Sequence, residues 1–587
     1  MKIKLMNERN EELTVTEQIF YNRGIEKEMI PKYLISSQEN THHYSLLKNI
    51  GLAAAQFLNH YEKGSKMMIQ ADVDVDGYTS GSVLYNYLVA NYPGIDLHVQ
   101  VRDAKIHGLD MTDDVNSGVY QLIFVPDAGS SEYLKHSQLK AAGVDVIVLD
   151  HHDTDKESEY AIVVNNQISP DYPNKSLSGV GIVYKFCQAL DDLDGTYNTN
   201  TRNADSYLDL VAVGNIADMV SFRYIETKTL IGLGLERLNE RNSENNILLN
   251  YMVSKQSYSL GKEVTPIGIA FYIAPFINAM IRSGTGEEKR FVFETFLDTV
   301  AIEKVPCTKR GAAKDSMEFR YEQAQRLLTN VKNRQKREVD PLVVLLKKQL
   351  TNDYLENNQV LIMEPPAGTN KNLFGLVANK IMAEYQRPAF VLSTDPATGT
   401  RSGSARNLDC DNLPFFREYV AETGLVNYAA GHSSAFGVSV DKDKFGPLVE
   451  KMNEELDFEN VEKVHPVDFM YTEKNIKAED LLEIGGMRSV WGQGVPEPLI
   501  YVHAKIRPCD VTLMSPDKKP TLKITVGGVS FIKFFSSMSQ YDEFVKGDSY
   551  YADVEIIGKC NLNEWQGRIT PQVFISEYVN NGFKLDF

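Results

Sequence analysis

Residues 66–77 read KMMIQADVDVDG, in which an apolar run, Met67 to Ile69, is followed by aspartates at every second position. The apolar run has the length and composition of a buried strand. The same order of apolar run, acidic turn and helix-like stretch repeats up to residue 150. Such repeats are typical of βα units that build a parallel sheet. The first half of the chain is therefore predicted to be an α/β domain.

Acidic and imidazole side chains follow three of these predicted strands. The second run lies in residues 121–131, QLIFVPDAGSS, and the third lies in residues 144–155, VDVIVLDHHDTD. A fourth contribution comes from the apolar helical stretch YLDLVAVGNIADMV at residues 207–220. In a parallel sheet, ligands bind beyond the carboxyl ends of the strands, so these side chains should converge there. They are Asp72, Asp74, Asp76, Asp127, Asp150, His151, His152 and Asp218.

So many anions in one pocket would repel one another unless cations held them. Oxygen ligands with imidazole and without thiolate suit manganese or magnesium better than zinc. Two metal ions bridged by a carboxylate are the usual device for activating water against a phosphorus centre. The sequence therefore predicts two divalent metal ions, Mn²⁺ or Mg²⁺, at this edge of the sheet.

The same residues also have simpler interpretations. The aspartate string resembles the start of a calcium loop, but an EF-hand requires Glu at its twelfth position, which here is Val83. An isolated Asp after a strand, such as Asp127, is commonly a helix N-cap. Four independent caps would not be expected to carry this composition in this order, so the joint pattern favours the metal site.

The composition indicates a folded cytosolic protein. The 587 residues correspond to about four domains, and the content of 43% hydrophobic and 24% charged residues is ordinary for soluble globular chains. The five cysteines are scattered and show no Cys-x-x-Cys spacing. The charged N-terminus argues against a signal peptide, so a cytoplasmic location is expected.

The longest uncharged run extends from Val264 to Ile281 and reaches the length of a membrane span. Pro266, Gly268 and Pro275 interrupt it, which makes it a poor span. We expect a buried strand, turn and helix there, and no membrane association.

The net charge of −18 argues on its face against a nucleic-acid binder. Whole-chain charge says little, however, when carboxylates gather at metals and cations line one groove. Ten cations lie between Lys304 and Arg337, on a segment whose part from about Ala312 to Arg337 predicts a connecting helix. We interpret them as a solvated helix face that is balanced by nearby glutamates.

Beyond this helix, a second α/β unit is expected from about Val360 to Val440, followed by a linker near Asp457 to Pro466. The last region, residues 467–587, contains short alternating runs such as TLKITV and SYYADVEII. These runs predict an all-β module, of the kind that forms a small barrel.

Taken in order, the motifs resemble those of RecJ-type single-strand-specific DNA exonucleases of the DHH phosphoesterase superfamily. The segments DVDVDG, PDAGSS, LDHH, VVNNQ with SLSGVG, and LVAVGNIADMV follow the order of the family's phosphoesterase motifs. RSGSARN and AAGHSSAFG resemble the substrate-binding loops of the DHH-associated domain. WGQGVPEP with NLNEWQGRITPQ resembles the C-terminal OB-fold region.

The resemblance implies four regions. Residues 1–225 would form the DHH phosphoesterase domain with an N-terminal extension, and residues 226–350 a helical region with the connecting helix. Residues 351–456 would form the second α/β, DHH-associated, substrate-binding domain. Residues 467–587 would form an OB-fold-like domain.

Carried over residue by residue, the resemblance also implies roles. The metal ligands would be Asp72, Asp74, Asp76, Asp127, His151 and Asp218, with Asp127 as the bridge. Asp150 would orient its neighbours, and His152 would face the scissile phosphate, which makes Asp127, His151 and His152 the catalytic group. Ser404 and Arg406 would hold a terminal 5′-phosphate with His432 close by, and Arg102 and Arg282 are candidate helpers.

Several positions depart from the family pattern. Phe276 stands where the family usually has Arg in a Pro-Arg-x-Asn segment, so one phosphate contact is missing or is supplied by Arg282. Ala405 replaces a glycine, Asn407 replaces a serine, and Ala430 begins the turn that is usually Gly-Gly-His. These departures concern end binding and leave the expected metal ligands intact.

The activity implied is a metal-dependent 5′-to-3′ exonuclease that degrades single-stranded DNA to 5′-mononucleotides in recombination, repair or replication. Two alternatives stay open: a short-oligonucleotide or nucleotide phosphoesterase of the same superfamily, and a catalytically silent replication scaffold. The expected partner is single-stranded DNA, and the resemblance leaves open a single-strand-binding protein or a helicase.

Overall fold

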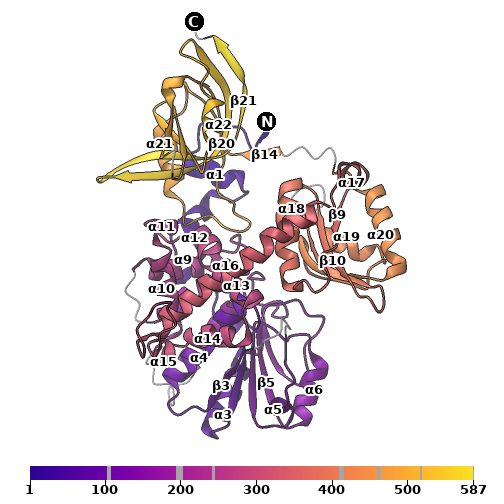
Figure 1. Cartoon of the computed structure of the whole chain (residues 1–587). Coiled ribbons are helices and arrows are strands. Elements are labelled where there is room, and N and C mark those ends of the chain that lie inside the picture. Colours follow the sequence, from indigo (N-terminus) through magenta and orange to yellow (C-terminus); the bar gives the residue numbers. More distant parts are fainter. Residues whose placement is uncertain are drawn as a thin grey trace.

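The computed structural model describes residues 1–101, 108–193, 202–240, 245–408, 415–458, 464–515 and 518–585. Figure 1 shows three bodies: at the bottom the domain that carries the predicted catalytic residues, called the catalytic domain after that prediction, a second lobe at the right and a C-terminal β-module at the top. The long helix α16 (Arg320–Lys347) crosses the centre and runs from the first body into the second.

The catalytic domain is built on a five-stranded parallel sheet of order β3-β2-β4-β5-β6. Apart from the edge strand β3, its strands are buried on both faces, as expected for a parallel sheet. Alternate side chains of β5, for example Ile147 and Val148, enter two different hydrophobic clusters. The strands are β2 (Met67–Gln70), β3 (Leu97–Gln100), β4 (Leu122–Pro126), β5 (Asp145–Asp150) and β6 (Ile162–Asn165). The predicted α/β class is confirmed.

Helices cover both faces of this sheet. The side chains of α3 and α7 belong to the larger cluster, and those of α5 and α6 to the smaller one. The helices α4, α7 and α8 also pack on one another, which brings the segment after β2 beside the segment before residue 218. The helices are α3 (Ile50–Glu62), α4 (Val75–Asn91), α5 (Asp113–Asn116), α6 (Tyr133–Ala141), α7 (Gly179–Leu193) and α8 (Leu208–Ala217).

A helical region follows in the chain and packs against α4 and α8, two of the helices that cover the sheet. It ends in the hairpin of β7 (Lys304–Pro306) and β8 (Met317–Phe319), which precedes α16. The helices of this region are α9 (Ile225–Glu240), α10 (Ile247–Lys255), α11 (Ser257–Leu260), α12 (Pro266–Tyr272), α13 (Ala274–Ser283), α14 (Gly286–Thr295) and α15 (Asp298–Ala301).

The uncharged run near residue 270 forms two helices, so the expected strand, turn and helix is wrong. Pro266 and Pro275 lie in the first turns of α12 and α13, where a missing N–H costs nothing, and they therefore start helices. Among the described residues, Pro266–Ser283 is the one helical segment long and apolar enough to be considered a membrane span. More than half of it is buried inside the structure, as in a core segment.

The connecting helix lies further along the chain than the sequence predicted. Residues 317–319 pair with β7 instead of entering the helix, and α16 continues to Lys347 with Pro341 inside it. The continuation is stabilised because Val339, Leu342 and Leu346 are buried in the core of the second lobe.

The second lobe contains a five-stranded sheet of order β12-β13-β11-β10-β9. Its strands are β9 (Leu361–Met363), β10 (Ala389–Thr394), β11 (Arg401–Arg406), β12 (Tyr428–His432) and β13 (Ala435–Val440). Its helices are α17 (Asn352–Asn357), α18 (Phe374–Tyr385), α19 (Phe416–Glu422) and α20 (Lys442–Glu455). The predicted second α/β unit is thus present.

The C-terminal β-module is one seven-stranded sheet of order β15-β16-β20-β21-β19-β18-β17, which agrees with the predicted all-β region. The strands are β15 (Phe469–Thr472), β16 (Ile500–Ile506), β17 (Val511–Met514), β18 (Thr521–Val526), β19 (Val529–Phe534), β20 (Tyr550–Trp565) and β21 (Arg568–Leu585). Two helices accompany them, α21 (Ala478–Gly486) and α22 (Met538–Asp542).

The N-terminal segment ties this module to the catalytic domain. Strand β1 (Lys2–Leu5) pairs in parallel with β14 (Val464–Val467), so part of the expected linker is a strand. The guanidinium of Arg23, which follows α1 (Val15–Asn22), forms a buried ion pair with Asp468 at 2.6 Å. Figure 1 shows the N-terminus beside β14, at the base of the module.

Candidate metal centre

The candidate ligands lie at the carboxyl ends of three neighbouring strands. Asp72 and Asp74 follow β2, Asp127 follows β4 directly, and His151 follows β5 directly. Asp74 is also the N-cap of α4 and accepts a hydrogen bond from the backbone N–H of Gly77 at 2.9 Å. A helix cap and a candidate ligand are therefore the same side chain.

Asp127 sits on an unusual backbone. Its φ of 65° is in the left-handed region, which few residues other than glycine adopt. The first residue of α7, Gly179, packs directly against it, because a Cβ at position 179 would lie 2.4 Å from Oδ1 of Asp127. The turn after β4 and the glycine that opens α7 together hold the Asp127 carboxylate at the centre of the site.

Asp76 is held by the N-terminus of α7. Its Oδ2 accepts the backbone N–H of Gly179 at 2.7 Å, and its Oδ1 accepts the backbone N–H of Val180 at 3.1 Å. The hydroxyl of Ser178 donates to Oδ1 at 3.2 Å. A helix N-terminus favours an anion, so α7 fixes the orientation of this carboxylate.

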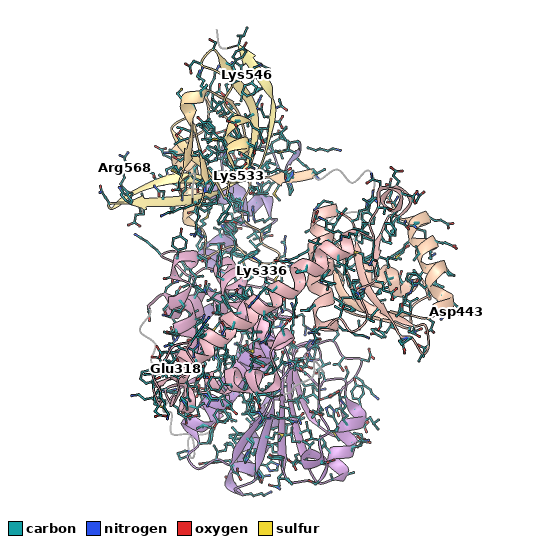
Figure 2. All side chains as sticks on the ribbon, in the orientation of Figure 1. Glu318, Lys336, Asp443, Lys533, Lys546 and Arg568 are labelled. Carbon is teal, nitrogen blue, oxygen red and sulfur yellow. The ribbon has the colours of Figure 1, made fainter. Side chains whose placement is uncertain are left out.

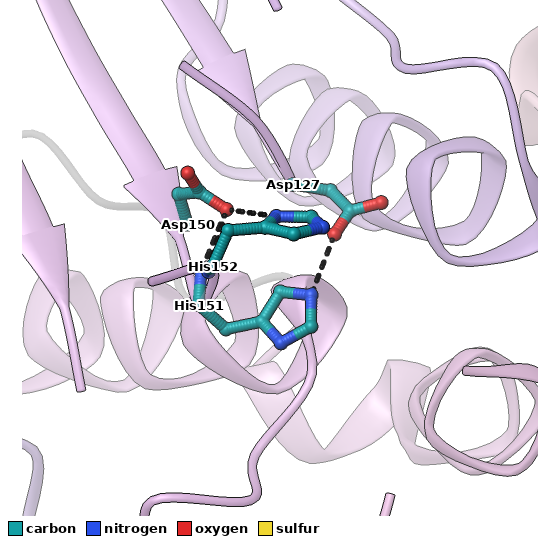
Figure 3. A group of neighbouring side chains, drawn as sticks. All are labelled: Asp127, Asp150, His151 and His152. Atoms are coloured by element: carbon teal, nitrogen blue, oxygen red, sulfur yellow. Dashed lines mark hydrogen bonds and ion pairs between the residues drawn. The ribbon is translucent and has the colours of Figure 1, made fainter. Parts of the chain in front are cut away.

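These side chains converge on the imidazole of His151. Its Nε2 lies 3.2 Å from Oδ1 of Asp127, 3.7 Å from Oδ2 of Asp218 and 3.9 Å from Oδ2 of Asp76. Figure 3 shows His151 and His152 side by side, with Asp127 above the first ring and Asp150 at the end of β5. Three overlapping groups have all their ligand atoms within 4.8 Å: Asp72, Asp74 and Asp127; Asp76, His151 and Asp218; and Asp127, Asp150, His151 and His152.

The buried, like-charged carboxylates of the cluster are unfavourable in their ionised form unless a cation is bound. Burial, followed by the charge of Asp74, raises the pKa of Asp76 to about 7. Burial and the charges of Asp76 and Asp74 raise the pKa values of Asp127 and Asp218 well above the ordinary range. Burial lowers the pKa of His151 to about 4, which leaves a neutral imidazole that can act as a ligand.

The residues present fit divalent metal ions. Both carboxylate oxygens of Asp127 are buried, and neither accepts a hydrogen bond from an N–H or O–H donor within the described part of the chain. Nε2 of His151 is also buried and has no hydrogen-bond partner among the described residues. Unsatisfied buried carboxylate oxygens are costly unless they coordinate a cation. Carboxylates with one imidazole form a donor set suited to Mn²⁺ or Mg²⁺.

Asp150 differs from the other carboxylates because its oxygens are used by hydrogen bonds. It accepts the backbone N–H groups of Ser130, His151 and His152, and its Oδ1 lies 2.8 Å from Nδ1 of His152. Burial opposes its ionisation, but the contact with His152 outweighs burial and lowers the pKa of Asp150. The predicted orienting role is consistent with this geometry.

His152 is oriented by that contact and remains open to solvent. Burial lowers its pKa, but the hydrogen bond with Asp150 and the charge of Asp150 outweigh burial and raise the pKa of His152 to about 9. Its side chain is 56% exposed. Asn165 fixes the backbone on which it stands by donating to the carbonyl of His152 at 2.9 Å.

The second lobe presents the predicted phosphate contacts on one face of its sheet. Arg406 and His432 both pair with Ala435 of β13, from the strands β11 and β12 that flank it. Directly paired residues point to the same face, and Ser404 lies two positions before Arg406 on that same face. The charge of His432 is one of those that lower the pKa of His151, after burial and His152, so the lobe faces the metal cluster.

Arg282 and Arg406 meet where the two bodies approach each other. Asn372 donates from the second lobe to the backbone carbonyl of Arg282 at 3.4 Å. Burial and then the charge of Arg282 lower the pKa of Arg406 to about 10, and Arg282 in turn lies near Asp74. The guanidinium of Arg406 also lies against Gly375 in the first turn of α18.

No acidic side chain in the described ranges forms an ion pair with Arg282 or Arg406. Two half-buried guanidinium groups and a helix N-terminus thus place positive charge without a direct ion-pair partner beside the metal cluster. This arrangement favours binding of a phosphate group.

Among the predicted site residues, Arg102 lies outside the described residues. The others are placed in the metal cluster, beside it or on the facing sheet of the second lobe. The sequence motifs contain Ser178, Gly179 and Asn165 but indicated no role for them. Gly179 alone had a signal, a glycine at the start of a predicted helix, which is consistent with close packing on another backbone.

The sequence is similar to those of known proteins. Residues 66–215 match the model of the DHH family, N-terminal domain. The chain is 35% identical over 585 residues to YorK, a Bacillus subtilis SPbeta prophage protein assigned to the single-strand DNA-specific exonucleases, and the match covers 98% of both. It is 27% identical over 553 residues to the single-stranded-DNA-specific exonuclease RecJ of B. subtilis, covering 92% of this chain and 64% of that protein.

Solved structures share the fold. The crystal structure of Thermus thermophilus RecJ with Mn²⁺ matches with a TM-score of 0.70 at 20% identity, over 96% of this chain and 76% of the other. The structure of the same protein with Mg²⁺ matches with a TM-score of 0.65 at 19% identity, over 96% and 74%.

Proposed function

The chain belongs to the RecJ-type single-strand-DNA-specific exonucleases of the DHH family, and from this premise we propose that it removes 5′-mononucleotides from the 5′ end of single-stranded DNA with two divalent metal ions. The relatives named above supply the enzyme class. The polarity, the metal count and the residue roles are our proposal.

One observation carries the proposal, namely the buried cluster of carboxylates around His151 in which both oxygens of Asp127 lack a hydrogen-bond donor among the described residues. The metal ligands would be Asp72, Asp74, Asp76, Asp127, His151 and Asp218. When bound, the metal ions would activate water and neutralise charge on the phosphoryl oxygens, which supplies several kcal/mol. Asp127, central to the cluster, would join the two metal positions.

The protein's own groups would prepare the scissile phosphate. Asp150 holds Nδ1 of His152, which directs Nε2 away from β5. An imidazole oriented in this way can donate a hydrogen bond to a phosphoryl oxygen or to the leaving oxygen. The exposure of His152 supports a contact with substrate, whereas the burial of His151 supports metal binding.

The second lobe would bind the end of the substrate. Ser404 and Arg406 would hold the terminal 5′-phosphate, and Arg282 would approach it from the catalytic domain. A planar guanidinium matches phosphate oxygens, and two cations without acidic partners in the described ranges attract a dianion most strongly. Fixing the end of the DNA beside the metals would limit cleavage to the first phosphodiester.

The C-terminal β-module would extend the contact with single-stranded DNA, as an OB-like domain does. At the end of β19, Phe534 and Phe535 are 53% and 80% exposed, and Lys533 precedes them. Phe535 has a φ of 56°, which is an unfavourable backbone conformation for a bulky residue. Exposed rings and a cation suit stacking of unpaired bases.

The test is digestion of end-labelled single-stranded DNA, with the label at 5′ or 3′ and with or without a 5′-phosphate, in Mn²⁺ or in Mg²⁺. We expect release of labelled mononucleotide at once from the 5′ label and only late from the 3′ label, with no activity in chelator. Initial release from the 3′ label, equal digestion of blunt duplex, or activity confined to very short oligonucleotides would contradict the proposal.

A further inference from the structure

The cations along α16 do not all have the same surroundings. Three arginines form ion pairs that fasten this helix to α14 and to β8, in agreement with a charged face balanced by glutamates. The pairs are Arg320–Glu294, Arg326–Glu318 and Arg334–Glu288. Ion pairs with glutamates therefore explain only some of the ten cations between Lys304 and Arg337.

Lys332 and Lys336 form no ion pair within the described part of the chain. Asp340 lies near Lys336, but its carboxylate pairs with Lys380 at 2.5 Å. Residues four apart share a helix face, so the two lysines point the same way. Arg334, about 200° around the helix from Lys332, points to the opposite side.

Lys332 is held in an environment that is unusual for a lysine. Its Nζ lies 3.9 Å from the centre of the ring of Phe276, and burial lowers its pKa. A half-buried ammonium group normally has a carboxylate beside it. Here the ring of Phe276 stabilises the cation through its face, and the N–H groups of the ammonium can still donate hydrogen bonds to another acceptor. The arginine expected at position 276 is missing, but Lys332 of α16 places a positive charge beside that position.

We propose that Lys332 and Lys336 form a ridge on α16 that binds the phosphodiester backbone of single-stranded DNA beyond the scissile phosphate. The inference rests on the proposed function and adds a contact region to it. Phe276 and Arg282 lie six residues apart on α13, about 9 Å along the helix, and Arg282 is close to Asp74. Figure 2 labels Lys336 on α16 between the catalytic domain and the C-terminal β-module. Two cations without acidic partners in the described ranges match a polyanion.

The test compares two pairs of substitutions that remove the same charge. The ridge variant is Lys332→Gln with Lys336→Gln. The control is Lys347→Gln with Lys451→Gln, because these lysines already have carboxylate partners, Glu384 and Glu455, and neither partner lies beside Lys332 or Lys336. All proteins also carry Asp127→Asn, so that DNA is not consumed. Fluorescence anisotropy then measures binding of a 5′-phosphorylated dinucleotide and of DNA of about 20 nucleotides over a range of salt concentrations.

We expect the ridge variant to bind the long DNA about tenfold more weakly. The slope of log K against log salt should fall by about 1.4, or about 0.7 for each DNA phosphate that the variant no longer neutralises. Binding of the dinucleotide should not change, because its two phosphates are the terminal and the scissile ones. The control pair should bind both ligands like the parent.

Equal losses in the two pairs, an unchanged salt slope or an equal loss for the dinucleotide would overturn the proposal. Weaker binding of polyglutamate without weaker binding of DNA would also overturn it, because the ridge would then bind an acidic protein. Binding does not depend on hydrolysis. If the ridge variant binds long DNA more weakly but the parent protein fails the digestion test, the proposed nuclease activity is refuted and the ridge stands. If the parent digests DNA as expected but the ridge variant binds normally, the ridge is refuted and the nuclease activity stands.

Discussion

At the scale of single residues, Asp127 combines an unfavourable backbone with an unfavourable charge. Its φ of 65° and its buried, like-charged surroundings both cost stability in the metal-free protein. Strain of this kind persists only where neighbouring structure holds it in place, here the contact with Gly179. We infer that binding of metal ions recovers the electrostatic part of this cost.

Asp127→Asn should separate charge from conformation, because asparagine tolerates the left-handed region. We expect turnover to fall by about 100-fold or more, while the melting temperature in chelator rises by about 2–4 °C for each kcal/mol of relieved repulsion. Added Mn²⁺ should stabilise the variant less than the parent. Thermal unfolding with and without Mn²⁺, beside a nuclease assay, measures all three.

Asp127→Ala is the companion variant. It should also abolish turnover and leave DNA binding largely intact, but the alanine at positive φ should cost about 1–2 kcal/mol. Near-normal activity in either variant would refute the assignment of Asp127 as a ligand.

Gly179→Ala should disturb the site without changing any charge. The new Cβ would lie 2.4–2.7 Å from Oδ1, Cβ and Cα of Asp127, so the start of α7 must move. We expect the free energy of unfolding to fall by about 1–3 kcal/mol. Added Mn²⁺ should stabilise this variant less than it stabilises the parent. Gly446→Ala is the control, since this glycine in α20 has nothing within 4 Å of its would-be Cβ. It should be neutral or slightly stabilising, and equal effects of the two substitutions would argue against the close contact.

At the scale of elements, two helix N-termini serve opposite partners. That of α7 binds the carboxylate of Asp76, whereas that of α18 lies against the guanidinium of Arg406. The second arrangement repels unless an anion lies between or beside the two groups. The face of the second lobe is therefore suited to bind phosphate.

Arg406→Gln should remove the advantage of a 5′-phosphorylated end. We expect kcat/KM on phosphorylated single-stranded DNA to fall about 10–100-fold, the range for removal of a charged hydrogen bond, with little change on 5′-hydroxyl DNA. Arg401→Gln, at the other end of β11, removes the same charge from a side chain stacked on Phe445 and should have little effect. Equal losses on both kinds of DNA end would contradict the end-binding role.

The elements were predicted best where one local pattern fixed them. Strands that end in acidic residues were recognisable because burial and polarity change abruptly at residues such as Asp127. The two helices α12 and α13 were missed because Pro266 and Pro275 can either break a helix or start one, and only tertiary packing decides which.

The contacts between distant segments could not be read from the sequence. The approach of Arg406 to Arg282 depends on how the two bodies dock, and that of Lys332 to Phe276 depends on how α16 packs against α13. The sequence did not distinguish Lys332 from the other cations of its charged run. The two faces of α16 differ in whether glutamates of other elements form ion pairs with their cations, and composition does not show this.

At the scale of the whole molecule, the N-terminal segment holds the C-terminal β-module in place. Arg23 and Asp468 are each only 2% exposed, and Arg23 also donates to the carbonyls of Ile19 and Pro496. Phe20 packs near Trp491, which is itself fully buried. The position of the module therefore depends on residues at the other end of the chain.

Arg23→Ala should loosen this attachment. Removal of one partner leaves the charge of Asp468 buried, which costs about 3–5 kcal/mol. We expect limited proteolysis to release the C-terminal module early, while stabilisation by Mn²⁺ persists in the catalytic domain. Lys584→Ala breaks the more exposed pair with Asp553 and should cost about 0–1 kcal/mol. Release of the module at the same rate in both variants would argue against the attachment.

The pairing of β1 with β14 also affects how the chain is made. Lys2 pairs with Val464, 462 positions later, so at about 5–20 residues per second the first strand waits roughly 20–90 s on the ribosome for its partner. An unpaired strand invites association with other nascent chains. The lysines at positions 2 and 4 alternate with apolar residues along this strand and would discourage such association by mutual repulsion until translation reaches β14.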